Sequence, residues 1–145
     1  MGSVEECLKT KPERVISVRS GDHVVTALER MRDNRVRAVL VIDDDALVGV
    51  ITQGDCAIKV LLPGKDAKQT LVSDAMTANP MTVKPSDPLE ACMGLMSKRG
   101  FRHLPVMLAN RVVGVISVGD VVKDSLRHMG DQIGFLETYI KGHGA

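Results

Sequence analysis

The segment Gly49-Val-Ile-Thr-Gln-Gly-Asp55 returns as Gly114-Val-Ile-Ser-Val-Gly-Asp120, at an offset of 65 residues. The match continues towards the N-terminus at the same offset without a gap. Identical residue types align at six further pairs of positions: Val48 with Val113, Val41 with Val106, Arg37 with Arg102, Met31 with Met96, Asp22 with Asp87, and Val18 with Val83. Because a sustained internal repeat is typical of a duplicated structural unit, the sequence predicts two copies of one fold.

Both copies predict the same order of elements, β-α-β-β-α. In each, an extended segment precedes a turn and a helix with one apolar face, then a hairpin, then a second helix that starts after Gly-Asp. The first copy has these elements at 15–18, 24–31, 38–42 and 47–51, and after Asp55. The second copy has them at 81–83, 89–96, 103–108 and 112–116, and after Asp120.

The predicted fold class is α+β (α/β), with the two units packed as one pseudo-symmetric module. Each unit has about 50 residues, which is too few for comfortable stability alone, so we expect the two units to share one core. The expected boundaries are 1–66 for the first motif with its N-terminal lead-in, 67–125 for the second motif, and 126–145 for a helical tail that continues the last helix.

Composition and charge argue against some classes of binding partner and indicate in which compartment the protein works. Apolar residues make up 44% and charged residues 26% of the 145 residues, as in soluble globular proteins. A net charge of +1 and 2% aromatic residues argue against nucleic acid and against an anionic membrane as partners. The apolar runs are strand-sized, the three cysteines are far apart, and no histidine has metal-ligand spacing. We therefore expect a cytoplasmic protein without a metal site.

The repeated segments resemble the CBS-motif family, in particular the tandem pairs known as Bateman modules. The resemblance also includes Phe101-Arg102-His103-Leu104-Pro105-Val106, and the lead-in Asp74-Ala75-Met76-Thr77 followed by Met81-Thr82-Val83. It covers roughly residues 4 to 125. It implies a cleft between the motifs that binds an adenosyl compound: AMP, ADP, ATP, S-adenosylmethionine or NADH. It also implies a homodimer and regulation of an effector protein.

Four polar residues at the strand-to-helix turns are candidate ligand contacts. Asp55 and Asp120 can each accept both hydroxyls of a ribose diol, while Thr52 and Ser117 can donate to a phosphate or ribose oxygen. The same four residues could instead cap the helices that follow them. The first copy departs more from the family pattern, so occupation of one site or of both stays open.

The resemblance implies two further groups of contacts. Arg37, Arg102 and His103 stand where relatives bind phosphate, and the arginine fork suits that anion. Ile16 and Met81 would line the adenine slot. His103 could equally be a strand histidine with no role in binding, and the sequence does not decide which first strand joins which aspartate.

The last helix is predicted to extend far beyond its counterpart in the first copy. Its apolar residues follow a heptad-like spacing: Val122, Leu126, Met129, Ile133, Leu136 and Ile140. Gly130 and Gly134 weaken such a helix by about 1 kcal/mol each, so it needs a packing partner. That partner is either its own domain or another subunit of a homodimer, which we favour.

The predicted function is a regulatory sensor of an adenine nucleotide that acts on a partner protein, with no cofactor required. The alternative is a structural or protein-interaction module with degenerate pockets. An enzyme is not expected, because the chain has no Gly-x-Ser-x-Gly elbow, no phosphate-binding Gly-x-x-x-x-Gly-Lys loop and no cysteine beside a base.

Overall fold

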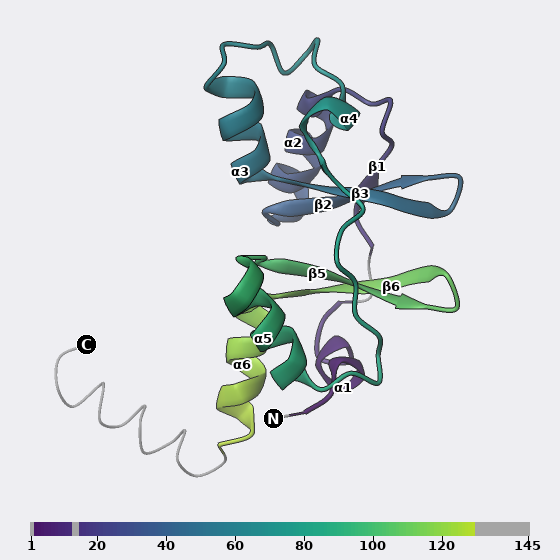
Figure 1. The fold of residues 1–145 in the computed structure, drawn as a ribbon, viewed down its shortest axis with the longest axis vertical. Helices are drawn as coiled ribbons and strands as arrows, with labels where there is room; N and C mark the ends of the chain where they lie inside the picture. Colours follow the sequence, from purple (N-terminus) through teal and green to yellow (C-terminus); the bar gives the residue numbers. More distant parts are fainter. Residues whose placement is uncertain (1, 13–14, 130–145) are drawn as a thin grey trace, which may run out of the picture.

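The computed structural model describes residues 2–12 and 15–129. Two β-sheets occupy the middle of the molecule, and helices cover the outer side of each sheet (Figure 1). The first motif lies in the upper half of this view and the second motif in the lower half. The predicted α+β pair of units is confirmed.

The first motif forms a four-stranded sheet in the order β1-β2-β3-β4, in which the edge strand β4 (Thr77–Ala78) comes from the lead-in of the second motif. Its elements are β1 (Ser17–Val18), α2 (Val24–Asn34), β2 (Ala38–Asp43), β3 (Ala46–Thr52), and α3 (Gln53–Cys56), which continues as a π-helix, η1 (Ala57–Leu61). β1 pairs parallel with β2 because α2 crosses over between them, and β2 and β3 form an antiparallel hairpin. Asp44 and Asp45 have positive φ values of 48° and 66°, the left-handed conformation that a two-residue hairpin turn requires.

The second motif repeats this arrangement with α5 (Leu89–Arg99), β5 (His103–Leu108), β6 (Arg111–Ser117) and α6 (Val118–Arg127). β5 and β6 form the hairpin, with the same left-handed turn at Ala109 and Asn110. Val83 makes a parallel bridge to Val106, which corresponds to the pairing of β1 with β2. The predicted extended segment at 81–83 is thus reduced to a single bridge.

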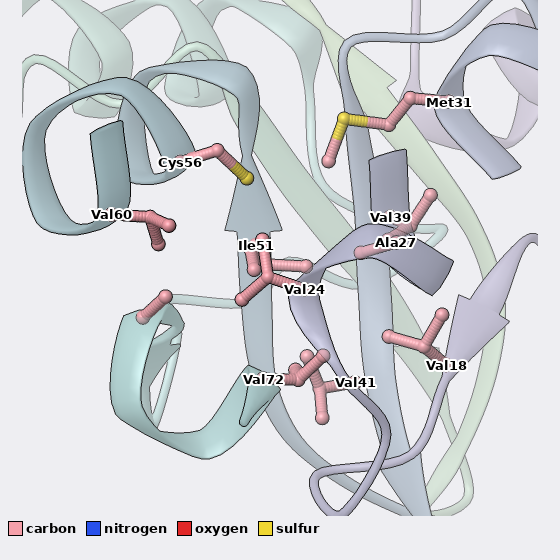
Figure 2. Close-up of a cluster of buried hydrophobic side chains, with 11 residues drawn as sticks. Val18, Val24, Ala27, Met31, Val39, Val41, Ile51, Cys56, Val60 and Val72 are labelled. Carbon is pink, nitrogen blue, oxygen red and sulfur yellow. The ribbon is translucent and has the colours of Figure 1, made fainter. Parts of the chain in front are cut away.

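Buried apolar side chains form two clusters, one in each motif. The predicted face of α2 is buried at Val24, Ala27 and Met31, and Figure 2 shows it packed against side chains from β1, β2, β3 and the helix after β3. The second cluster contains the equivalent residues of α5, which are Leu89, Cys92 and Met96. The expectation of a single shared core is therefore wrong, because the buried residues form two separate cores.

The two motifs exchange their lead-in segments, the short helices that precede the first strand of each motif. The lead-in α1 (Val4–Leu8), which the predicted boundary of 1–66 places in the first motif, buries Val4 and Cys7 in the core of the second motif. The corresponding α4 (Val72–Ala75) is buried in the core of the first motif. Each core thus includes a helix from the lead-in of the other motif, as expected for units of about 50 residues that bury too little apolar surface alone.

This exchange explains the glycine that opens each repeated segment. A Cβ atom on Gly49 would lie 2.6 Å from Sδ of Met76 and 2.9 Å from the carbonyl oxygen of Thr77, which belongs to β4 (Thr77–Ala78). A Cβ atom on Gly114 would lie 2.7 Å from Cδ2 of Leu8. Glycine at both positions lets the exchanged segment lie directly against the sheet.

The predicted tail is described only as far as Met129. α6 ends at Arg127, and the heptad positions Ile133, Leu136 and Ile140 lie outside the described residues. Within α6 and just after it, Val122, Leu126 and Met129 are exposed. Among the described helices, none is both long and apolar enough to cross a bilayer.

Candidate functional site

Both strand-to-helix turns form a capping box. Ser117 Oγ accepts a hydrogen bond from the backbone N–H of Asp120 (3.2 Å), and Asp120 Oδ2 accepts one from the N–H of Ser117 (2.8 Å). Thr52 and Asp55 do the same at 3.0 and 3.1 Å. The hydroxyl residue is the N-cap and the aspartate is the third helical residue. Capping uses only Oδ2 of each carboxylate, so it does not exclude a contact between Oδ1 and a ligand.

A cleft of about 1140 Å³ lies between the two motifs and is lined by residues of both motifs and of the N-terminal lead-in. Six of the nine predicted site residues line it: Ile16, Arg37, Arg102, His103, Ser117 and Asp120. The first strand of the first motif therefore joins the aspartate of the second motif. Thr52, Asp55 and Met81 do not line this cleft, and Met81 packs beside the second core.

The surroundings of Asp55 differ from those of Asp120. Lys59, one turn further along the same helix, places Nζ 3.3 Å from Asp55 Oδ1 and also donates to the carbonyl oxygen of Met76 at 3.4 Å. The hydroxyl of Thr77 donates to the same Oδ1 at 3.5 Å. The linker between the motifs therefore lies against this turn, and the two predicted sites are not equivalent.

Positive charge dominates the cleft. Seven of its lining residues are Lys or Arg: Lys9, Lys11, Arg35, Arg37, Arg102, Lys123 and Arg127. Glu5 and Asp120 are the acidic ones. Charges of one sign that line a concave, partly dehydrated surface concentrate counter-ions, so this cleft attracts anions. Arg37 and Arg102 stand just before β2 and β5, and the backbone carbonyl of each accepts a hydrogen bond from the first turn of the following helix (3.0 Å in both).

His103 lies opposite Ser117 in the β5–β6 hairpin. Burial lowers the pKa of its imidazole, and the nearby charges of Arg102 and Lys11 lower that pKa further. At neutral pH the ring is therefore uncharged, with one nitrogen able to donate a hydrogen bond and the other able to accept one. Both the cleft-lining role and the strand role weighed for this residue are compatible with its position.

Asp120 has an intramolecular counter-ion. Lys11 Nζ lies 2.7 Å from Asp120 Oδ2 and also 2.7 Å from the carbonyl oxygen of Val115. Burial opposes ionisation of Asp120, but the hydrogen bonds from Lys11 and Ser117 outweigh it and lower the pKa of the carboxyl group. The carboxylate is thus charged at neutral pH.

Sequence reasoning missed five of the seven cationic residues of the cleft, among them Lys11 and Arg35. The repeat could not have revealed Lys11, because the exchanged segments match at a different offset: Leu8 packs on Gly114 as Met76 packs on Gly49. Arg35 ends α2 in the left-handed conformation (φ 55°), whereas its repeat partner is Gly100 (φ 72°). A side chain in that conformation costs about 1 kcal/mol relative to glycine, and this departure within the repeat is a signal that can be read from the sequence.

No group of three or more His, Cys, Asp or Glu side chains within residues 2–12 and 15–129 is placed to hold a metal ion. The arrangement is instead that of an anion-binding cleft with one carboxylate that can accept hydroxyl groups.

Known proteins with the same fold identify the family. The family model for the CBS domain matches the chain twice, at residues 4–61 and 72–127. The mitochondrial CBS domain-containing protein CBSX3 of Arabidopsis thaliana is 32% identical over 83% of this chain, which spans 61% of that relative's length. Two further Arabidopsis relatives are longer, and the chain spans 23% and 22% of them.

Solved structures agree with this match. A protein with CBS domains from Burkholderia ambifaria superposes with a TM-score of 0.82 and 37% identity, over 85% of this chain and 93% of that one. CBSX2, solved in complex with AMP, superposes with a TM-score of 0.70 and 26% identity, over 88% of this chain and 98% of that one. The two repeats, the fold and both kinds of match lead to one conclusion: this chain belongs to the CBS-domain family, with two CBS motifs in tandem.

Proposed function

We propose that the chain is a regulatory module that binds a phosphorylated adenosine compound in the cleft between its two CBS motifs. The observation that carries the proposal is that one cleft brings together a charged carboxylate, Asp120, and two arginines, Arg37 and Arg102, from different motifs. A ribose diol and a phosphate group need these two kinds of partner. The AMP complex of CBSX2 supports the same class of ligand.

In this proposal the ribose hydroxyls bind Asp120, the phosphate binds Arg37, Arg102 and His103, and the adenine lies against Ile16. The excess of cations in the cleft favours AMP, ADP, ATP or NADH over S-adenosylmethionine, whose sulfonium is itself positive. Only the site at Asp120 is proposed to be filled, because Asp55 lies outside the cleft.

The test is isothermal titration of the purified protein with AMP, ADP, ATP, NADH and S-adenosylmethionine. Asp120→Ala is the variant, and Asp55→Ala is its matched control, since it removes the equivalent capping box outside the cleft. Charge-assisted hydrogen bonds contribute about 1.5–3 kcal/mol, so we expect Asp120→Ala to weaken binding at least about tenfold and Asp55→Ala to leave it within about twofold. Equal loss in both variants would contradict the assignment of the site.

We further propose that the module forms a homodimer and acts on an effector protein in a compartment where its three buried, unpaired cysteines stay reduced. Ligand control of an effector requires two conformations with different affinities for the nucleotide.

The CBS family is not catalytic, so the two motifs are not an enzyme.

The second candidate function is a protein-interaction module without a ligand. It is favoured by the exposed apolar side chains on the helix that follows Thr52 and on α6. If isothermal titration of a folded dimer detects no binding of any of the five compounds, this alternative is favoured.

A further inference from the structure

Lys11 forms an ion pair with Asp120, the carboxylate that binds the ribose hydroxyls in the proposed function. Lys11 lies beyond α1 in the lead-in and belongs to neither repeated segment, yet its ammonium group is within 2.7 Å of both Asp120 Oδ2 and the carbonyl oxygen of Val115. Its side chain is 31% exposed and that of Asp120 is 14% exposed, so the ion pair is largely shielded from solvent. Such a pair is screened less by salt than a surface pair.

The two lone-pair positions of Asp120 Oδ2 are already filled. One accepts from the backbone N–H of Ser117 and the other from Lys11 Nζ. A carboxylate oxygen offers about two acceptor positions, so a diol that binds both oxygens of Asp120 needs Lys11 to leave Oδ2. The capping bond from Ser117 can stay, because it alone leaves one position on Oδ2 open.

Release of Lys11 creates a need for another anion. A partly buried ammonium group that keeps only the carbonyl oxygen of Val115 has lost its counter-ion, and the acidic residues that line the cleft are Asp120 and Glu5. The phosphate of a nucleotide bound at Asp120 would lie among Arg37, Arg102 and His103, and the charge of Lys11 already acts on His103. The phosphate of the same ligand can thus replace the carboxylate as the partner of Lys11.

The first motif has no equivalent of this arrangement. Lys59, the cation beside Asp55, comes from the same helix and its side chain is 42% exposed. Leu8 packs on Gly114 as Met76 packs on Gly49, so the counterpart of Lys11, three residues after Leu8, is the uncharged Asn79. Among the described residues, only the second motif therefore has a carboxylate whose counter-ion comes from the exchanged lead-in.

We propose that Lys11 is a specificity-determining residue of the cleft, which occupies Asp120 when the cleft is empty and transfers to the ligand phosphate when a nucleotide binds. A nucleoside without phosphate breaks the ion pair of Lys11 with Asp120 and offers Lys11 no new anion. A nucleotide replaces that ion pair with one between Lys11 and the phosphate. Lys11 thereby makes recognition of the ribose depend on the presence of a phosphate. This inference rests on the proposed function.

The test compares the affinities of AMP and adenosine by isothermal titration in wild type, Lys11→Met and Lys11→Arg, with Lys98→Met as a control for loss of a lysine charge. Lys98 lies on α5, is exposed and does not line the cleft. In Lys11→Met we expect adenosine to bind more tightly and the ratio of AMP to adenosine affinity to fall about tenfold, the value of one charge-assisted hydrogen bond. Lys98→Met and Lys11→Arg should keep the ratio within about threefold of wild type.

The outcomes separate this inference from the proposed function. If Lys11→Met binds both ligands but keeps the wild-type ratio, or weakens both by one factor, Lys11 is only structural and the inference is overturned while the nucleotide site stands. If none of the four proteins binds either ligand, the inference is overturned, and the proposed function is decided by its own titration with the five compounds. Thermal unfolding of Lys11→Arg, which keeps the charge, shows whether a change at this position alters the fold.

Discussion

The surroundings of His103 in the cleft lower the pKa of its imidazole. His103 faces Ser117 across the β5–β6 hairpin, and burial together with Arg102 and Lys11 lowers the pKa of its imidazole below the ordinary value of about 6.5. The unfolded chain therefore binds a proton on this side chain at a higher pH than the folded chain does.

The sign of the resulting pH effect follows from proton linkage. Between the ordinary pKa and the lowered one, the unfolded state holds more protons, so the free energy of unfolding falls as the pH is lowered from about 6.5. We expect urea unfolding at pH 7.5, 6.5 and 5.5 to show this loss in wild type and a smaller loss in His103→Gln. His23→Gln, which changes an exposed histidine, should retain the wild-type dependence. Parallel pH curves for wild type and His103→Gln would contradict the assignment.

At the scale of elements, the exchanged lead-in is held by a buried carboxylate. Asp124 of α6 is 2% exposed, and its Oδ2 accepts from the backbone N–H of Gly2 at 3.1 Å while Arg127 lies 3.3 Å from its Oδ1. Val4 and Cys7 of α1 then fill the second core. A helix as short as α1 has little stability of its own, so its position depends on such contacts.

Replacing Asp124 should therefore release α1 locally. Cys7 reports on this, because burial, followed by the charges of Asp120 and Asp124, raises the pKa of its thiol and keeps it unreactive. In Asp124→Ala we expect alkylation of Cys7, followed by mass spectrometry, to accelerate at least about tenfold, while Cys56 in the first core stays protected. Lys123→Ala, a change on the same helix, is the control. Equal acceleration at Cys7 and Cys56 would indicate global unfolding instead.

At the scale of the whole molecule, two corresponding helices present apolar side chains to solvent. Ile58, Leu61 and Leu62 on and after η1 are 63%, 77% and 75% exposed, and Val122 and Leu126 on α6 are 52% and 43% exposed. Soluble monomers rarely leave such groups of large apolar residues uncovered. Because the two helices are related by the repeat, one dimer contact can cover both.

We expect light scattering after size exclusion to give a dimer for wild type and a monomer for the double variant Leu61→Glu with Leu126→Glu, because burying two carboxylates in an apolar interface is unfavourable. Leu108→Glu is the control, since Leu108 is exposed at the end of the β5–β6 hairpin, away from these helices. A dimer that survives the double variant would mean that subunits associate through another surface.

Local patterns in the sequence predicted the elements and most of the cleft. The repeat, the apolar spacing of Val24, Ala27 and Met31, and the turn at Asp44 and Asp45 are properties of neighbouring residues, which is why they can be read without a structure. The resemblance to CBS motifs then pointed to Arg37, Arg102, His103, Ser117 and Asp120, which line one cleft.

Tertiary structure alone decided how the segments are exchanged and which aspartate faces the cleft. The sequence by itself determined two copies of a β-α-β-β-α unit, because hydrophobic period and turn chemistry act over a few residues. It could not place α1 on the second motif, join Ile16 to Asp120, or put Lys11 on that carboxylate. The contact of Lys11 with Asp120 alone joins residues 109 positions apart, and such contacts arise because neither small core is complete until the lead-in of the other motif packs against it.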